Sequence, residues 1–248
     1  MKKLIISIFG ALTIGSALAD EVQIAVAANF AAPMEEIALA FNKATGHQLK
    51  ISTGASGKFY AQIRNGAPFQ VFLSADEEKP AQLEKDGLAV QGSRFTYAIG
   101  KLALWSANPH TVDAQGKVLT SNRFNKLALA NPKTAPYGEA AIEALTALQL
   151  KHQLEPKFVM GENISQTFQF VESGNAEIGF IALSQVTRNN RLTAGSLWLV
   201  PDKLYTPIRQ DTVLLTNGKD SNAARQLLFF LKSETALHII KSYGYAVN

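Results

Sequence analysis

The sequence predicts an α/β protein with two lobes, and three observations lead to this fold class. Strand-like and helix-like runs alternate along the chain, which is typical of largely parallel sheets covered by helices. The 248 residues are enough for two separate hydrophobic cores. Two long extended runs, 95–105 and 205–215, flank a second round of alternation and exceed the usual strand of about 5–6 residues. We interpret them as crossovers between lobes; two long strands of one sheet are the alternative.

Apolar periodicity predicts the elements of the first part of the chain in order. Met34, Ile37 and Phe41 recur at helical spacing. Pro33 lies in the first turn of this helix and Gly46 lies beyond its end. Alternating apolar residues mark the strands in the same way. The expected strands are 22–28, 48–53 and 69–75, and the expected helices are 33–44, 57–65 and 77–85.

The alternation restarts between the two long runs and continues to the end of the chain. Ile142, Leu145 and Leu148 predict the buried face of one helix, and Ser221 is a typical N-cap for another. The expected strands are 127–130, 157–160, 178–182 and 197–200, and the expected helices are 137–150, 165–173, 222–232 and 234–243. On this plan, lobe one comprises 20–97 and 208–248, and lobe two comprises 98–207.

Residues 1–19 have the pattern of a cleavable secretory signal peptide. Lys2 and Lys3 precede an apolar run that ends in the small residues of Ala17-Leu18-Ala19. We therefore expect a mature, periplasmic protein that begins at Asp20. An uncleaved membrane anchor is the less favoured alternative, because the apolar run is shorter than the roughly 20 residues needed to span a bilayer.

The composition argues against several classes of protein. The formal charge of +4 falls to +2 without Lys2 and Lys3, and the basic residues are dispersed, which argues against a nucleic-acid partner. The chain has no cysteine, so it can form neither a disulfide nor a thiolate metal site. The sequence contains no nucleophile elbow, and no histidine or carboxylate pair suggests a metal site. We therefore expect a protein that is not an enzyme.

Two loops near the start of the mature chain have the pattern of an anion site. Ala28 and Asn29 follow the first strand, and Ser56 lies between Gly54 and Gly57 after the second. Backbone N–H groups at the start of a helix have no partner within that helix and favour anions. The alternative is that Asn29 and Ser56 only cap helices. A nucleotide is disfavoured, because the glycine and the hydroxyl that a phosphate-binding loop needs at 52 and 59 are absent.

Two further strand-to-helix loops repeat this arrangement in the expected second lobe. Pro136 presets the first turn of a helix and leaves the N–H of Tyr137 unpaired. Ile164 follows Gly161-Glu162-Asn163 with its own N–H available. Because ligands of open α/β sheets bind beyond the carboxyl ends of the strands, loops from both lobes can face one another across a cleft.

These loops resemble those of the periplasmic molybdate-binding proteins of ABC importers, within the type II substrate-binding proteins. The most specific match is the segment 66–76, GAPFQVFLSAD; the other matching segments are 26–30, 54–58, 130–132, 136–138, 161–164 and 243–245. The resemblance covers essentially the whole mature chain. It implies a two-lobed type II periplasmic binding protein, in which each lobe is a mixed, mostly parallel sheet flanked by helices and two crossover strands join the lobes.

The resemblance also implies a function and a set of site residues. The chain is expected to capture molybdate, and tungstate as well, and to deliver it to the membrane permease of an ABC transporter as a monomer without a cofactor. Asn29 and Ser56 are implied to supply side-chain and backbone donors, Tyr137 and Ile164 to supply backbone N–H groups, and Ala28 to add to the first loop. The metal of molybdate or tungstate is therefore expected to bind as part of an oxyanion, and no residue is expected to coordinate it directly as a cation.

The sequence departs from the family pattern at two positions. Many members carry a tyrosine, whose hydroxyl donates to the anion, where this chain has Ala182. Many members also have serine where this chain has Asn29, and in this respect the chain resembles a subgroup that lacks the tyrosine. These departures leave the number of donors open but do not change the place of the site.

Other ligands and activities remain as alternatives. A different tetrahedral oxyanion, such as sulfate or phosphate, would use the same loops, although a cavity sized for molybdate or tungstate holds the smaller sulfate poorly. An organic acid would be expected to need an arginine clamp, and the four loops contain no arginine. A secreted hydrolase would need a nucleophile–base pair. Near the loops, we expect Lys58 to point into solvent and Glu35 and Glu36 to lie on a solvated helix face.

Overall fold

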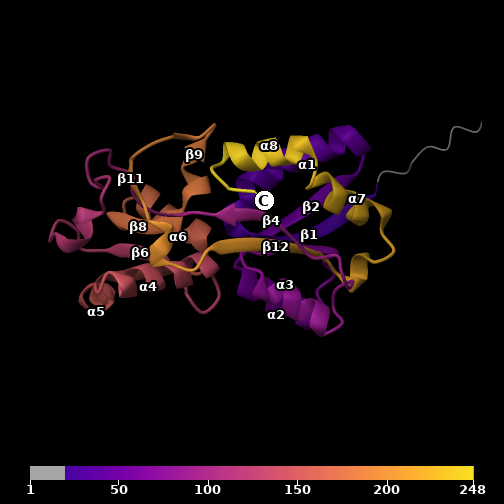
Figure 1. The fold of residues 1–248 in the computed structure, drawn as a ribbon, viewed down its shortest axis with the longest axis horizontal. Coiled ribbons are helices and arrows are strands. Elements are labelled where there is room, and N and C mark those ends of the chain that lie inside the picture. The colour runs from indigo at the N-terminus through magenta and orange to yellow at the C-terminus, as the bar shows by residue number, and fades with distance from the viewer. Residues whose placement is uncertain (1–19, 248) are drawn as a thin grey trace, which may run out of the picture.

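The computed structural model describes residues 20–247, so the expected signal peptide at 1–19 lies outside the described residues. Figure 1 shows two halves side by side along the long axis, each built on its own β-sheet with flanking helices. This architecture confirms the predicted α/β fold class with mixed sheets. Within residues 20–247, no helix is long and apolar enough to cross a membrane.

The first half is built on a five-stranded sheet in the order β2-β1-β3-β12-β4. Its strands are β1 (Glu21–Ala27), β2 (Gln48–Gly54), β3 (Val71–Leu73), β4 (Phe95–Gly100) and β12 (Ile208–Leu214). β1 pairs in parallel with β2 and β3, whereas β12 runs antiparallel to β3 and β4. The sheet is therefore mixed rather than mostly parallel, because the two pairings of β12 are antiparallel.

Helices cover both faces of the first sheet. One face carries α1 (Ala31–Thr45), α7 (Asn222–Phe230) and α8 (Glu234–Ser242), and the other carries α2 (Ser56–Arg64) and α3 (Glu78–Lys85). Along β1, Ile24 and Val26 belong to the core on the first of these faces, and Ala25 belongs to the core on the second. Both sets of side chains are buried, because successive residues of a strand point to opposite faces of the sheet.

The second half repeats the plan with a five-stranded sheet in the order β11-β5-β8-β6-β7. Its strands are β5 (Leu102–Ser106), β6 (Leu127–Ala130), β7 (Phe158–Gly161), β8 (Ile178–Ala182) and β11 (Ser196–Leu199), and its helices are α4 (Pro136–Ala147), α5 (Lys151–Leu154) and α6 (Ile164–Glu172). β6 is parallel to β7 and β8, and β5 is antiparallel to β8 and β11. Leu127 and Leu129 pack with α4, and Ala128 packs with Val171 of α6.

The two halves are joined by segments that cross from one sheet to the other. The predicted extended run 95–105 divides at Lys101, with β4 in the first sheet and β5 in the second. The chain returns after β11 through the short 3₁₀ turn Asp202–Leu204 to β12. The alternative of two long strands in one sheet is therefore wrong for 95–105, whereas the strand of the second run, β12, lies in the first sheet alone and the crossing precedes it. The expected lobe limits fall within β4 and at the start of β12; the division into lobes itself stays a prediction.

Most differences from the expected elements lie at their ends. The expected strands 127–130 and 178–182 are confirmed as β6 and β8. The expected helix 137–150 instead stops at Ala147 and is followed by α5, because Gln149 adopts a left-handed conformation with φ 60° that a helix cannot continue through. The hairpin of β9 (Thr187–Arg188) and β10 (Arg191–Leu192) is not predicted from the sequence, since it is too short to show a periodic pattern.

The close packing of α4 against β6 gives a first testable prediction. A side chain at Gly138 would place its Cβ 2.7 Å from the carbonyl carbon of Ala130 and closer still to the oxygen. We expect Gly138→Ala to lower the free energy of unfolding by about 1–3 kcal/mol in denaturant titrations, as overpacking does. The control Thr146→Ala changes an exposed position of the same helix and is expected to stay within about 0.5 kcal/mol of the wild type. Equal stabilities for both variants would contradict this account of α4 packing.

Candidate functional site

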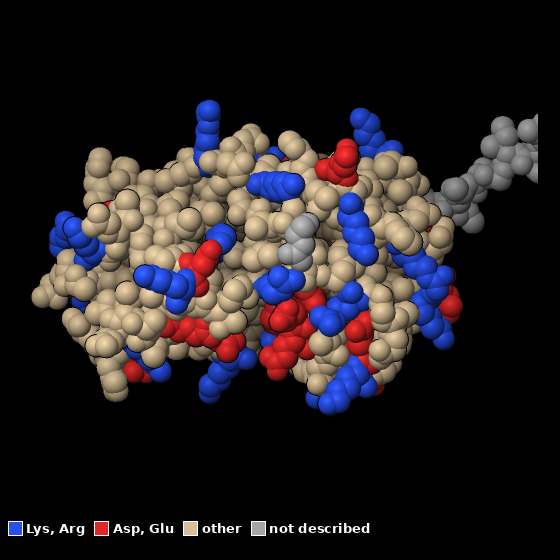
Figure 2. Space-filling view, viewed as in Figure 1, with Lys and Arg blue, Asp and Glu red and all other residues tan. Residues whose placement is uncertain are grey.

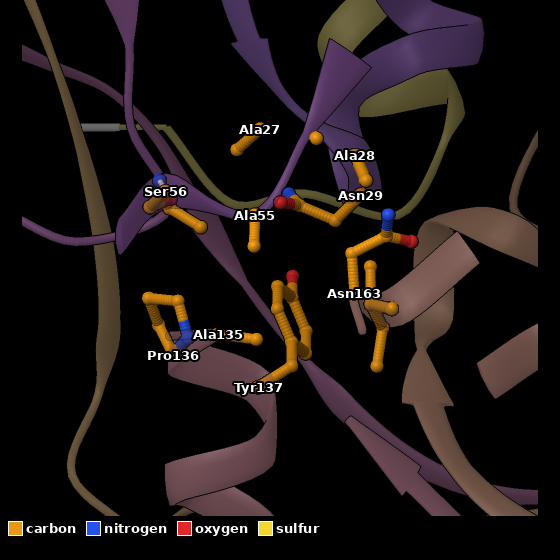
Figure 3. A pocket seen from close by; sticks show the side chains of 12 residues that line it. Ala27, Ala28, Asn29, Ala55, Ser56, Ala135, Pro136, Tyr137 and Asn163 are labelled. Carbon is orange, nitrogen blue, oxygen red and sulfur yellow. Dashed lines mark hydrogen bonds between the residues drawn. The ribbon is translucent and has the colours of Figure 1, made fainter. Parts of the chain in front are cut away.

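A small neutral pocket lies between the two halves, where β1 and β2 end and where α2, α4 and α6 begin (Figure 3). All five site residues expected from the sequence line it, which are Ala28, Asn29, Ser56, Tyr137 and Ile164. The others that line it are Ala27, Gly54, Ala55, Ala75, Ala135, Pro136 and Asn163. None of these residues carries a charge. Ala182 is buried in β8 and does not line the pocket.

The size of the pocket restricts what it can hold. The space open to the centre of a water molecule is about 10 Å³, whereas pockets for drug-sized organic ligands have volumes of roughly 300–1,000 Å³. A second hollow beside it, of about 260 Å³, is lined by acidic side chains, among them Asp76, Glu77 and Glu143. The negative field of those carboxylates disfavours an anion there. The smaller pocket therefore suits a compact solute, and a compact anion in particular.

The second half contributes two backbone donors through the way its helices begin. Pro136 has no N–H, and the Gly138 N–H bonds the carbonyl oxygen of Ala135 at 2.8 Å, so Tyr137 provides the first N–H that α4 does not use. At α6, the Asn163 side-chain oxygen accepts from the next two N–H groups after Ile164, at 2.9 and 3.0 Å. This N-cap leaves the Ile164 N–H as the donor that the helix start does not pair.

The first half contributes Ser56 at the start of α2. Its hydroxyl oxygen accepts the Ala75 N–H at 2.9 Å, so its own hydrogen is free to donate to a ligand. Ala55, not Ser56, is the N-cap residue of this helix, and no side chain caps the start of the helix. The alternative that Ser56 only caps a helix is therefore wrong. The next residue, Gly57, donates its N–H to the Thr134 carbonyl at 2.9 Å and so joins the two halves beside the pocket.

Asn29 is held by residues that the sequence did not single out for this role. Its side-chain nitrogen donates to the Gln210 side-chain oxygen at 2.8 Å and to the Tyr245 hydroxyl at 2.9 Å. Both amide hydrogens are thus engaged within the protein, contrary to the side-chain donor expected at Asn29, and the backbone N–H of Asn29 is left as its donor for a ligand. Asn29 lies inside the 3₁₀ turn Ala28–Phe30 and caps no helix with its side chain. The segment 243–245 gave a sequence signal for Tyr245, but Gln210 had none.

The tyrosines beside the pocket are neutral at physiological pH. Burial raises the pKa of the Tyr137 phenol well above its ordinary value, and burial does the same for Tyr97. The Tyr137 ring rises from α4 toward Asn29 in Figure 3. Since the pocket has no charged side chain, any stabilisation of an anion comes from hydrogen-bond donors and from the positive ends of the helices.

Two expectations about charged residues are corrected by the structure. The ammonium group of Lys58 lies 2.7 Å from a carboxylate oxygen of Glu162 in the other half, rather than free in solvent, and it lowers the pKa of that carboxyl group. Glu36 is not simply solvated, because its carboxylate pairs with Arg188 and accepts the Tyr243 hydroxyl at 2.7 Å. Within residues 20–247, no cluster of three or more histidine, aspartate or glutamate side chains could hold a metal cation.

Comparisons with known proteins agree with this architecture. Residues 22–246 match the family model described as bacterial extracellular solute-binding protein. The chain is 54% identical to a molybdate-binding protein of Azotobacter vinelandii, over 100% of this chain and 98% of that protein. It is 51% identical to a molybdate-binding protein of Rhodobacter capsulatus, over 96% and 94% of the two chains. These relatives are named as binding proteins rather than enzymes.

Solved structures show the same fold. The periplasmic molybdate-binding protein of Azotobacter vinelandii superposes with a TM-score of 0.89 and 43% identity, covering 92% of this chain and 99% of that one. A sulfate-binding protein of Mycobacterium tuberculosis superposes with a TM-score of 0.71 at 13% identity, covering 91% and 86%. The second match supports the two-sheet fold alone, because its identity is low.

The N-cap of α6 gives a prediction that separates stability from binding. Asn163→Ala removes the acceptor that holds the start of α6, so we expect the free energy of unfolding to fall by about 0.5–2 kcal/mol and oxyanion affinity to fall several-fold. The matched control is Ser221→Ala, which removes the N-cap of α7 away from the pocket. It is expected to lose similar stability and to keep its affinity, as measured by chemical unfolding and calorimetric titration. An unchanged affinity in Asn163→Ala would argue against the assigned donor at Ile164.

Proposed function

The chain belongs to the bacterial extracellular solute-binding proteins and, within them, to the periplasmic molybdate-binding proteins of ABC importers, and on this premise we propose that it captures molybdate in the pocket between its two sheets. It is a binding protein, not an enzyme. The observation that carries the proposal is the convergence of unpaired helix-start N–H groups from both halves on one small, uncharged pocket.

The chemistry of the pocket favours an inorganic oxyanion over the alternative ligands. Ser56 offers a hydroxyl hydrogen, and Asn29, Tyr137 and Ile164 offer backbone N–H groups, all of which bond an oxyanion strongly without a counter-charge. No arginine lines the pocket to clamp a carboxylate, and its small volume is unsuited to an organic acid. No histidine, aspartate or glutamate lines it either, so Ser56 has no general base beside it for hydrolysis.

We extend the proposal to tungstate, which has nearly the same size as molybdate. Discrimination against sulfate follows if the donors are held at fixed positions, because a smaller anion cannot reach all of them at hydrogen-bond distance. Phosphate carries a proton at neutral pH. Its P–O–H group is a hydrogen-bond donor, and it would face donors of the pocket rather than an acceptor. The pocket is thus expected to separate anions by size and protonation but to separate molybdate from tungstate poorly.

The proposed mechanism of capture is closure of two lobes around the anion. Lobe one would comprise 20–97 with 208–248, and lobe two 98–207, with the crossing segments as the hinge. An anion bonded by both lobes favours the closed arrangement, because it makes its full set of contacts only there. The closed protein would then deliver its ligand to the permease of an ABC transporter. It would act as a periplasmic monomer after removal of 1–19. We expect no nucleic-acid partner, because lysine and arginine side chains are scattered over both halves on the face in Figure 2.

Calorimetric titration of the mature chain tests the proposal. We expect one-to-one binding of molybdate and tungstate, with much weaker binding of sulfate and phosphate. Ser56→Ala removes one donor to a charged ligand, an interaction worth about 1.5–3 kcal/mol, so affinity should fall by roughly one to two orders of magnitude.

The matched control is Ser93→Ala, because the Ser93 hydroxyl bonds the Val90 carbonyl and does not line the pocket. It should bind molybdate as the wild type does. No heat with any of the four anions would overturn the proposed function. Equal affinities for Ser56→Ala and the wild type would overturn the role given to Ser56.

A further inference from the structure

A buried side-chain amide lies behind the pocket, where the two sheets meet. Gln210 of β12 is fully buried. Its side-chain oxygen accepts from the Asn29 side-chain nitrogen at 2.8 Å and from the Tyr97 hydroxyl at 3.0 Å. Its side-chain nitrogen donates to the Tyr137 hydroxyl at 3.2 Å. One amide thus contacts a pocket residue from each half of the molecule.

The three partners of Gln210 differ in which half of the molecule they belong to. Asn29 follows β1, and Tyr97 lies on β4, so both belong to the first half together with Gln210. Tyr137 belongs to α4, which packs on the second sheet. If the halves separate, the bonds to Asn29 and Tyr97 can stay, whereas the bond to Tyr137 must break. The Gln210–Tyr137 bond is therefore specific to the closed arrangement.

A glycine makes room for the Tyr137 hydroxyl. At Gly100, the last residue of β4, an added Cβ would lie 2.6 Å from the Gln210 side-chain nitrogen and closer still to the Tyr137 hydroxyl oxygen. The φ of Gly100 is not positive, so the backbone conformation itself does not require glycine. The Tyr137 hydroxyl and the Gln210 side-chain nitrogen together take the space that a side chain at this position would need.

We propose that Gln210 and Gly100 are positioning residues for oxyanion capture, forming a socket that receives the Tyr137 hydroxyl when the lobes close. The inference rests on the proposed function and adds residues outside the pocket lining. Seating the hydroxyl fixes the first turn of α4 against the first lobe and thereby places the Tyr137 N–H at the anion. The same amide holds Asn29, so one group sets the spacing between donors of the two lobes.

The test compares two tyrosines that bond the same amide. Tyr137→Phe removes the hydroxyl that crosses between the halves and keeps the backbone N–H that faces the anion. We expect the Kd for molybdate to rise about 3- to 10-fold, mainly through faster dissociation. The matched control is Tyr97→Phe, because the Tyr97 hydroxyl bonds Gln210 and the Ser74 carbonyl within the first half. It should lower thermal stability and raise the Kd for molybdate less than Tyr137→Phe does.

A second pair of variants tests the socket itself. Gly100→Ala fills it, so we expect at least a 10-fold weaker affinity for molybdate and less compaction on adding molybdate in small-angle X-ray scattering. Its thermal unfolding transition establishes that it folds. Adding Tyr137→Phe to Gly100→Ala removes the closest overlap, and the double variant should bind molybdate more tightly than Gly100→Ala alone. A residue with only a structural role would give no such rescue.

The outcomes distinguish this inference from the proposed function. A wild-type protein that does not bind molybdate overturns the proposed function and this inference with it. A wild-type protein that binds molybdate overturns the inference alone if Tyr137→Phe keeps the wild-type Kd, if Tyr97→Phe weakens binding as much, or if the double variant binds no better than Gly100→Ala.

Discussion

Backbone N–H groups that their own helices cannot pair are the constraint on which the site depends. Each helix start leaves such donors, and a buried donor without a partner destabilises a protein by about 1–3 kcal/mol. Here the starts of α2, α4 and α6 and the turn after β1 converge on one pocket. On the proposed function, an anion in that pocket would satisfy several of these donors together, and ligand binding and closure of the two halves would become parts of one equilibrium.

The small side chains around the pocket follow from the same constraint. Ala27, Ala55, Ala75 and Ala135 line it, and their short side chains allow backbone groups of both halves to approach a common centre. A lysine or arginine in their place would supply a full counter-charge, but it would also fill a cavity of this size. The pocket instead uses dipoles and neutral donors, which can be fixed in space more rigidly than a long flexible side chain.

Contacts across the pocket divide into exposed charged pairs and buried neutral bonds. The side chains of Lys58 and Glu162 are 50% and 66% exposed, so solvent screens their ion pair and it contributes little to holding the two halves together. In contrast, the Ser184 hydroxyl bonds the Asn29 carbonyl at 2.9 Å, and Gln210 bonds Tyr137, in fully buried surroundings. Hydrogen bonds are stronger in such a low-dielectric interior, and unpaired groups there are more costly. The buried neutral bonds therefore hold the two halves together in this arrangement more firmly than the exposed ion pair does.

The sequence by itself determined the alternating elements and the donor loops, because both are local. Apolar periodicity located β6 and β8, and Pro136 and the loop 161–164 marked the helix starts that expose the N–H groups of Tyr137 and Ile164. The tertiary structure alone decided which groups hold those donors in place. Asn29 and Gln210 are 181 residues apart, and the space at Gly100 is set by a tyrosine of the other half. Local patterns carry no information on such pairs, since a residue's periodicity shows which face it occupies but not which distant side chain it meets there.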